Sequence, residues 1–155
     1  MARFEFQLEG VLKHRERIEK DRQRDLAVAQ KEMVRLDSEL QALNLEVQQS
    51  TADVRDNRLV GRLDLPYLAA HRRYMLGMQR KVVAVSQKMG AQQLVVDAAR
   101  RALAEASKQK KILEKLREKQ HRRWSEALAR REAGAQDELT TQLSFRALAE
   151  AEGTL

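Results

Sequence analysis

Apolar residues recur at alternating steps of three and four along two long stretches of this sequence. The first series is Leu26, Ala29, Met33, Leu36, Leu40, Leu43, Val47, Ser50 and Val54. The second series is Leu68, His71, Met75, Met78, Val82, Val85, Met89, Gln92, Val96, Ala99, Leu103, Ala106, Lys110 and Leu113. An average step of about 3.5 residues places these side chains on one narrow stripe of a helix, the seam of a left-handed coiled coil. The pattern predicts helices from about Phe6 to Arg58 and from about Pro66 to Arg131.

One short segment between the two series carries the signals that end one helix and start another. Gly61 can adopt the positive φ that terminates a helix, and the sole proline of the chain, Pro66, suits the first helical turn. Asp64 or Leu65 then lies near the cap of the second helix. A bend at 58–66 folds the helices back on each other and pairs position i with roughly 122 − i.

The resulting fold class is all-α, an antiparallel coiled-coil hairpin of two long helices that spans 1–136. Aromatic residues make up only 4% of the chain and there are six glycines, so the sequence supplies neither the bulky core nor the turns of a compact globule. The tail at 137–155 carries Leu139, Leu143, Phe145 and Leu148. We expect this tail to be flexible or to form a short amphipathic helix.

The residue types needed for catalysis are not arranged in any recognisable site. His14, His71 and His121 lie far apart in the sequence, the glycines form no phosphate-binding loop, and there is no cysteine. A two-helix hairpin also lacks the interior that an active site needs in order to exclude water. We therefore expect no enzymatic activity, no catalytic residue, no cofactor and no metal.

Positive charge is concentrated in the second half of the chain. The net charge is +7, and residues 100–131 contain 12 basic and 4 acidic side chains. This segment is either a solvated helix face or a surface that attracts an acidic partner. Trp124 lies within it, and we expect this side chain either to pack on the Phe4–Phe6 segment or to anchor a partner.

Two motifs, one near each end of the chain, resemble those of the flagellar export protein family FliJ. Residues 3–16 read RFEFQLEGVLKHRE, which is similar to the family's opening F-x-F-x-L-E-x-V-L-x-x-R-E. Residues 113–119 read LEKLREK and are followed by RRE and DEL, which are similar to the family's closing motifs. The resemblance covers essentially the whole chain.

This resemblance implies a stalk-like protein of the flagellar type III export apparatus, similar to the gamma subunit of rotary ATP synthases. It implies three partners: a FliI-like export ATPase hexamer, the cytoplasmic domain of a FlhA-like export gate, and export chaperones. The ATPase-binding residues would be Phe4, Phe6, Leu8, Leu12, Leu116, Arg122, Arg123, Trp124, Arg131, Asp137 and Glu138. The gate-binding residues would be Tyr74 and Met78.

Three other functions fit the same sequence: the analogous stalk of a virulence injectisome, a basic nucleic-acid-binding coiled coil, and a scaffold. The basic segment lacks the aromatic platform typical of nucleic-acid binders, so we expect no nucleic-acid partner. No apolar run approaches the roughly 20 residues of a membrane span. We expect a cytoplasmic protein that associates peripherally with the inner face of the cell membrane at the flagellar base.

Overall fold

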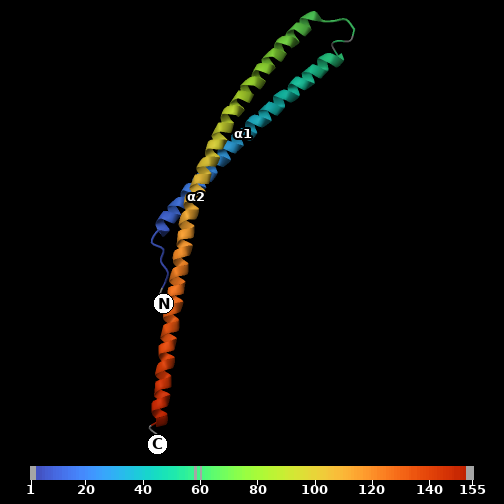
Figure 1. The fold of residues 1–155 in the computed structure, drawn as a ribbon. Helices are drawn as coiled ribbons and strands as arrows, with labels where there is room; N and C mark the ends of the chain where they lie inside the picture. The colour runs from blue at the N-terminus through green and yellow to red at the C-terminus, as the bar shows by residue number, and fades with distance from the viewer. Residues whose placement is uncertain (1–2, 58, 60, 153–155) are drawn as a thin grey trace. The chain divides into compact units, whose positions relative to one another are not determined.

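The protein is formed by two long helices, as a computed structural model shows for residues 3–57, 59 and 61–152, with 149–152 described by their backbone only. Helix α1 is Glu9–Asn57 and helix α2 is Leu65–Glu152 (Figure 1). The described part of the chain contains no strand, which confirms the predicted all-α class. The contacts divide the chain into two compact units. One is Arg17–Ser107, and the other joins the residues up to Glu16 with those from Lys108 onward.

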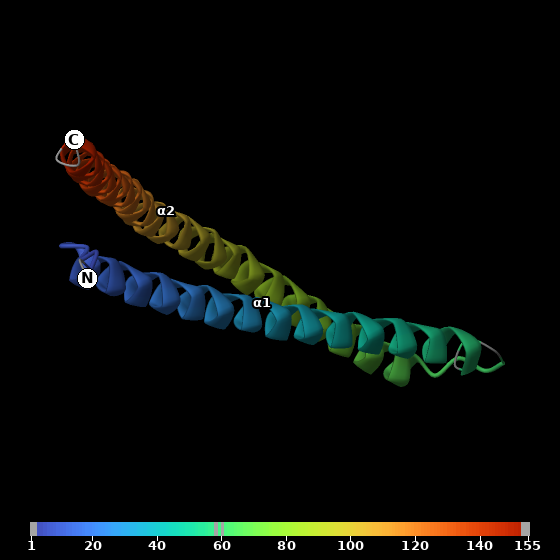
Figure 2. The same cartoon turned by 90° about the horizontal axis from the view of Figure 1, so that it is seen from below.

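The unit Arg17–Ser107 is an antiparallel helix pair held together by the predicted seam. Within this unit, residues 17–57 of α1 and 65–107 of α2 lie side by side in Figure 1 and remain neighbours in the perpendicular view of Figure 2. Every seam residue from Leu26 to Val54 and from Leu68 to Ala106 is buried or half-buried. Leu36 is only 3% exposed, whereas Val34, two positions away, is 65% exposed. The 3.5-residue period thus decides which apolar side chains leave water.

Charged and polar side chains that flank the seam help to set the pairing of the two helices. Glu32, Glu39 and Glu46 repeat every seven residues on α1, as do Tyr74, Lys81 and Lys88 on α2. The Glu46 carboxylate accepts a hydrogen bond from the Tyr74 hydroxyl. The pKa of Glu32 is lowered, mainly by its hydrogen bond from Arg35 and to a smaller extent by the charge of Lys88. Acidic residues on one helix therefore face hydroxyl and amino groups on the other.

Hydrogen bonds across the seam test the predicted pairing of position i with 122 − i. Ser50 lies 3.4 Å from the ring of His71, and the Gln92 amide donates to the Ala29 carbonyl at 2.9 Å. Both pairs lie within one residue of the prediction. Ser107 donates to Glu19 at 2.5 Å, four residues beyond the predicted partner. Side chains on a helix lean toward its N-terminus, and the long Glu19 side chain reaches in that direction.

The bend between Asn57 and Leu65 has the local chemistry that the sequence predicted. Gly61 adopts a φ of 89°, a conformation that costs other residues energy because their Cβ meets the backbone. The Asp64 carboxylate accepts a hydrogen bond from the Tyr67 backbone N–H at 3.1 Å, and the Asp64 carbonyl accepts one from the Leu68 N–H. Asp64 is therefore the N-cap of α2.

Helix α2 continues past Arg131 to Glu152, so the helix predicted to end there extends into the predicted tail. Gly134 destabilises a helix by about 1 kcal/mol relative to alanine, but Ala133 and Ala135 beside it are the best helix formers and no proline follows. The side chains at 129–148 are all exposed. This part of α2 is therefore a helix without a covered face.

Candidate partner-binding site

The non-helical segment before α1 packs against α2 within the unit that contains the chain's two ends. The Phe6 carbonyl of this segment accepts a hydrogen bond from the Glu9 N–H at 3.1 Å, and the Leu8 carbonyl accepts one from the Leu12 N–H at 2.9 Å. These two hydrogen bonds form the start of α1. Phe6 is 8% exposed and Leu12 only 2% exposed. Leu8 is 37% exposed and Leu116 is half-buried. The apolar opening motif therefore holds this segment in place and leaves Leu8 in contact with solvent.

Three aromatic rings meet beside this segment and form what we name the aromatic cluster: Phe4, His121 and Trp124. The Phe4 ring meets the His121 ring edge-on with centroids 5.0 Å apart, and the Trp124 ring lies 5.9 Å from each of the other two. Such aromatic pairs contribute about 0.5–1.5 kcal/mol in addition to the free energy gained by burying their apolar area. Trp124 is half-buried, so part of its ring remains available to a partner.

Opposite charges border the aromatic cluster. Arg117 on α2 lies 3.6 Å from Glu9 on α1, and both side chains are partly exposed. One surface groove beside this pair is lined by Arg3, Phe4, Glu5, Phe6, Glu9, Lys13 and Arg117. A second is lined by Phe4, Glu114, Arg117, Glu118 and His121. Phe4 and Arg117 line both grooves, which places an apolar ring and a cation at the centre of this surface.

Basic side chains extend this surface along α2. Arg122 lies 3.4 Å from Glu118, but both side chains are 71% exposed, and such pairs contribute little to stability. Arg123 and Arg131 are exposed and form no ion pair with any described residue. Asp137 and Glu138 are also exposed, and no hydrogen bond or ion pair among the described residues joins them to the N-terminal segment. Arg123 and Arg131 are thus exposed cations without a partner among the described residues.

The two residues that the family resemblance assigned to the export gate lie in the other unit. Tyr74 is 44% exposed, and its hydrogen bond to Glu46 raises the pKa of the phenol. Met78 occupies the seam and is 2% exposed. A partner can therefore touch Tyr74 directly, whereas Met78 supports the helix surface from below.

Two features of the site were not singled out from the sequence. The first is the ion pair of Glu9 with Arg117, which lies four residues beyond the position that the pairing rule predicts opposite Glu9. The second is His121, which completes the aromatic cluster. The pairing rule does put Phe4 near position 118, one helical turn from His121. Extending that rule to the N-terminal segment would have found the cluster.

The described part of the chain has neither a membrane-spanning helix nor a metal-binding cluster. Among residues 3–57, 59 and 61–152, neither helix has a stretch long and apolar enough to cross a bilayer. The same residues contain no group of three or more His, Asp or Glu side chains that could hold a metal ion.

Comparison with known protein families shows which family the chain belongs to. The family described as the flagellar FliJ protein matches residues 4–149, which include the opening motif, both helices and most of the exposed part of α2. The chain belongs to the FliJ family. Comparisons with curated proteins and with solved structures found no match. Membership makes it a coiled-coil protein associated with flagellar protein export, in a family whose members are non-catalytic components of the export machinery.

The family assignment also bears on the alternatives. A flagellar FliJ match over nearly the whole chain favours the flagellar branch over the injectisome stalk. Partners of a FliJ-family chain belong to the flagellar export apparatus, and its location is that machinery. The aromatic cluster and the basic residues next to it are formed within the matched region.

Proposed function

We propose that this FliJ-family chain binds the flagellar export ATPase through the aromatic cluster and the adjacent basic part of α2, and promotes assembly and activity of the ATPase ring. The observation that carries the proposal is the packing of Phe4 on Trp124 and His121, with Arg123 adjacent to Trp124 in the sequence and Arg131 about two turns further along α2. A half-buried tryptophan beside unpaired arginines is the composition typical of the energetic centre of a protein interface.

The charge of this surface supports an acidic partner. Exposed arginines accelerate association with an acidic surface and bind carboxylates with two hydrogen bonds. In this proposal Phe4, Leu8, Leu116 and Trp124 supply apolar contacts, Arg122, Arg123 and Arg131 supply charge, and Asp137 and Glu138 extend the surface along α2. Phe6 and Leu12 are buried and hold the N-terminal segment in position.

The proposal includes a second contact near the bend. Tyr74, partly exposed on the unit Arg17–Ser107, binds the cytoplasmic domain of the export gate, and the chain thereby links ATPase and gate. Export chaperones dock on the same apparatus, and the chain is cytoplasmic and peripheral to the inner face of the cell membrane at the flagellar base. Replacing Tyr74 with Ala should weaken binding to the gate domain while leaving ATPase binding unchanged.

Charge reversal tests the ATPase contact. The triple variant Arg122→Glu, Arg123→Glu and Arg131→Glu should lose binding to the purified export ATPase and stimulation of ATP hydrolysis. The control is Arg72→Glu with Arg73→Glu, which reverses two exposed arginines in the other unit and should leave both readouts intact. Circular dichroism verifies that each variant remains helical. Undiminished binding and stimulation by the triple variant would show that this surface does not bind the ATPase.

A further inference from the structure

Helix α2 carries a second series of positions at alternating steps of four and three, on a side that does not face α1. The series is Leu76, Arg80, Val83, Gln87, Gly90 and Leu94, and every member is exposed. Its apolar members are strongly exposed, with Leu76 at 47%, Val83 at 55% and Leu94 at 69%. We name this series the outer face of α2. Solvent-facing positions of a coiled coil are ordinarily charged, but Arg80 is the single charged member between Leu76 and Leu94, and the next positions of the alternation are Arg73 and Asp97.

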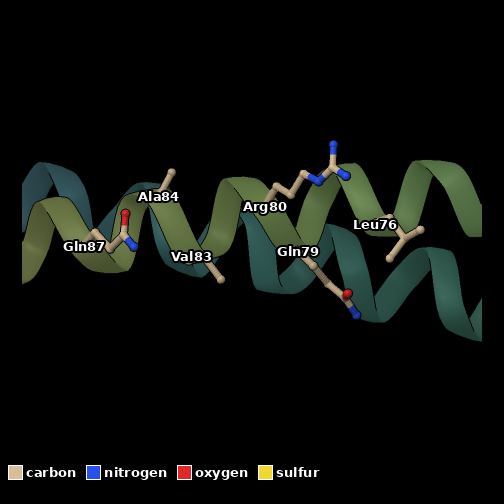
Figure 3. A pocket seen from close by; sticks show the side chains of 6 residues that line it. All are labelled: Leu76, Gln79, Arg80, Val83, Ala84 and Gln87. Atoms are coloured by element: carbon tan, nitrogen blue, oxygen red, sulfur yellow. The ribbon is translucent and has the colours of Figure 1, made fainter.

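The outer face contains a surface groove to which α1 contributes nothing. Six residues of α2 line it: Leu76, Gln79, Arg80, Val83, Ala84 and Gln87 (Figure 3). A helix uses one seam for each partner, so a second seam with a 3.5-residue period fits an additional helix. The small side chain of Ala84 lets a helix backbone approach closely. The shape of this face therefore matches a helix better than an extended peptide.

The charges around the groove indicate the chemistry of the partner. Arg80 lines it and Arg73 lies about one helical turn before Leu76, and neither arginine forms an ion pair with any described residue. The nearest acidic group on α2 is Asp97, which accepts a hydrogen bond from Gln93 at 3.0 Å and lies 3.9 Å from Arg100. Unpaired cations beside an apolar seam complement a helix whose apolar stripe is bordered by carboxylates.

We propose that the outer face of α2 binds an amphipathic α-helix of another protein, with an apolar stripe flanked by Asp and Glu. The outer face of a second copy is a poorer occupant, because a symmetric contact would bring Arg73 and Arg80 against the same cations. This contact is separate from the aromatic cluster and does not depend on ATPase binding. It adds a third helix to the pair formed by α1 and α2.

A designed peptide tests this interaction with the full chain. The probe is a fluorescently labelled 28-residue helix with Leu at the a and d positions of each heptad and Glu at the e and g positions. Its binding is followed by fluorescence anisotropy. The double variant Leu76→Gln with Val83→Gln should weaken binding by about tenfold or more, since two apolar contacts are lost. A peptide with Lys in place of each Glu should also bind at least about tenfold more weakly.

The matched control is Val34→Gln on α1, which replaces another exposed valine outside the outer face and should leave binding unchanged. Equal binding by the wild type and the double variant would overturn the proposal, and so would no binding of the acidic peptide to the wild type. Concentration-dependent dimerisation that the double variant abolishes would assign the face to a second copy and would also overturn it. ATPase stimulation by the double variant should equal that of the wild type.

Discussion

Leu36→Ala should destabilise the helix pair far more than a similar change two positions away. The Leu36 side chain is 3% exposed in the seam, and truncation removes three carbon atoms from contact with α2. Leucine-to-alanine changes in protein cores cost about 2–5 kcal/mol. We expect about 2–3 kcal/mol, because a two-helix seam is covered on fewer sides than the core of a globular domain. At about 2–4 °C per kcal/mol, the loss lowers Tm by roughly 4–12 °C.

The control for this prediction is Val34→Ala. Val34 is 65% exposed, and alanine has the higher helix propensity, so its free energy of unfolding should change by less than about 0.5 kcal/mol. Urea unfolding followed by circular dichroism at 222 nm measures both variants. Equal destabilisation by the two changes would refute the assignment of the seam, since it would mean that burial does not follow the 3.5-residue period.

Three further predictions concern single groups in the same helix pair. Asp64→Ala removes the carboxylate that accepts the Tyr67 N–H and should cost about 1 kcal/mol in urea unfolding; an unchanged midpoint would exclude a capping role. Gly61→Ala should cost about 1–2 kcal/mol through its φ of 89° alone, because no atom crowds the added Cβ, and Gly61→Asn should cost less. The Glu32 carboxyl, whose pKa the Arg35 hydrogen bond lowers, should titrate by NMR below an ordinary glutamate and return toward it in Arg35→Ala. Because its folded pKa is depressed, any stability it contributes is present above the unfolded pKa and is lost as the pH falls through the folded value.

The paired helices could be predicted because one periodic signal determines them. Leu36, Val85 and Val96 are buried since they fall on the seam, and Val28 remains exposed since it does not. Gly61 and Asp64 could be assigned to the bend because each performs a local task that the neighbouring sequence defines. Both the periodicity and the turn chemistry can be recognised from residues that are close together in the sequence.

The proposed partner-binding surface was less predictable, because it depends on which side chains meet across the helices. Nothing local to Phe4 indicates that its ring meets His121, whereas Met78, already on the predicted seam, is buried as that seam requires. Helix α2 runs through Gly134, where a single weak residue is outweighed by strong helix formers on both sides. The second seam at Leu76 and Val83 is hidden in the sequence by the stronger first one.

Trp124 offers the most direct test of the central claim, that the aromatic cluster binds the export ATPase. It is the only tryptophan of the chain, so labelling with 5-fluorotryptophan gives a protein with one ¹⁹F NMR signal. Addition of unlabelled export ATPase should shift or broaden this signal in proportion to the complex formed, because the half-buried ring becomes covered. A pull-down on the same sample verifies that the complex is present. An unchanged ¹⁹F signal in a sample where the complex forms would contradict the account.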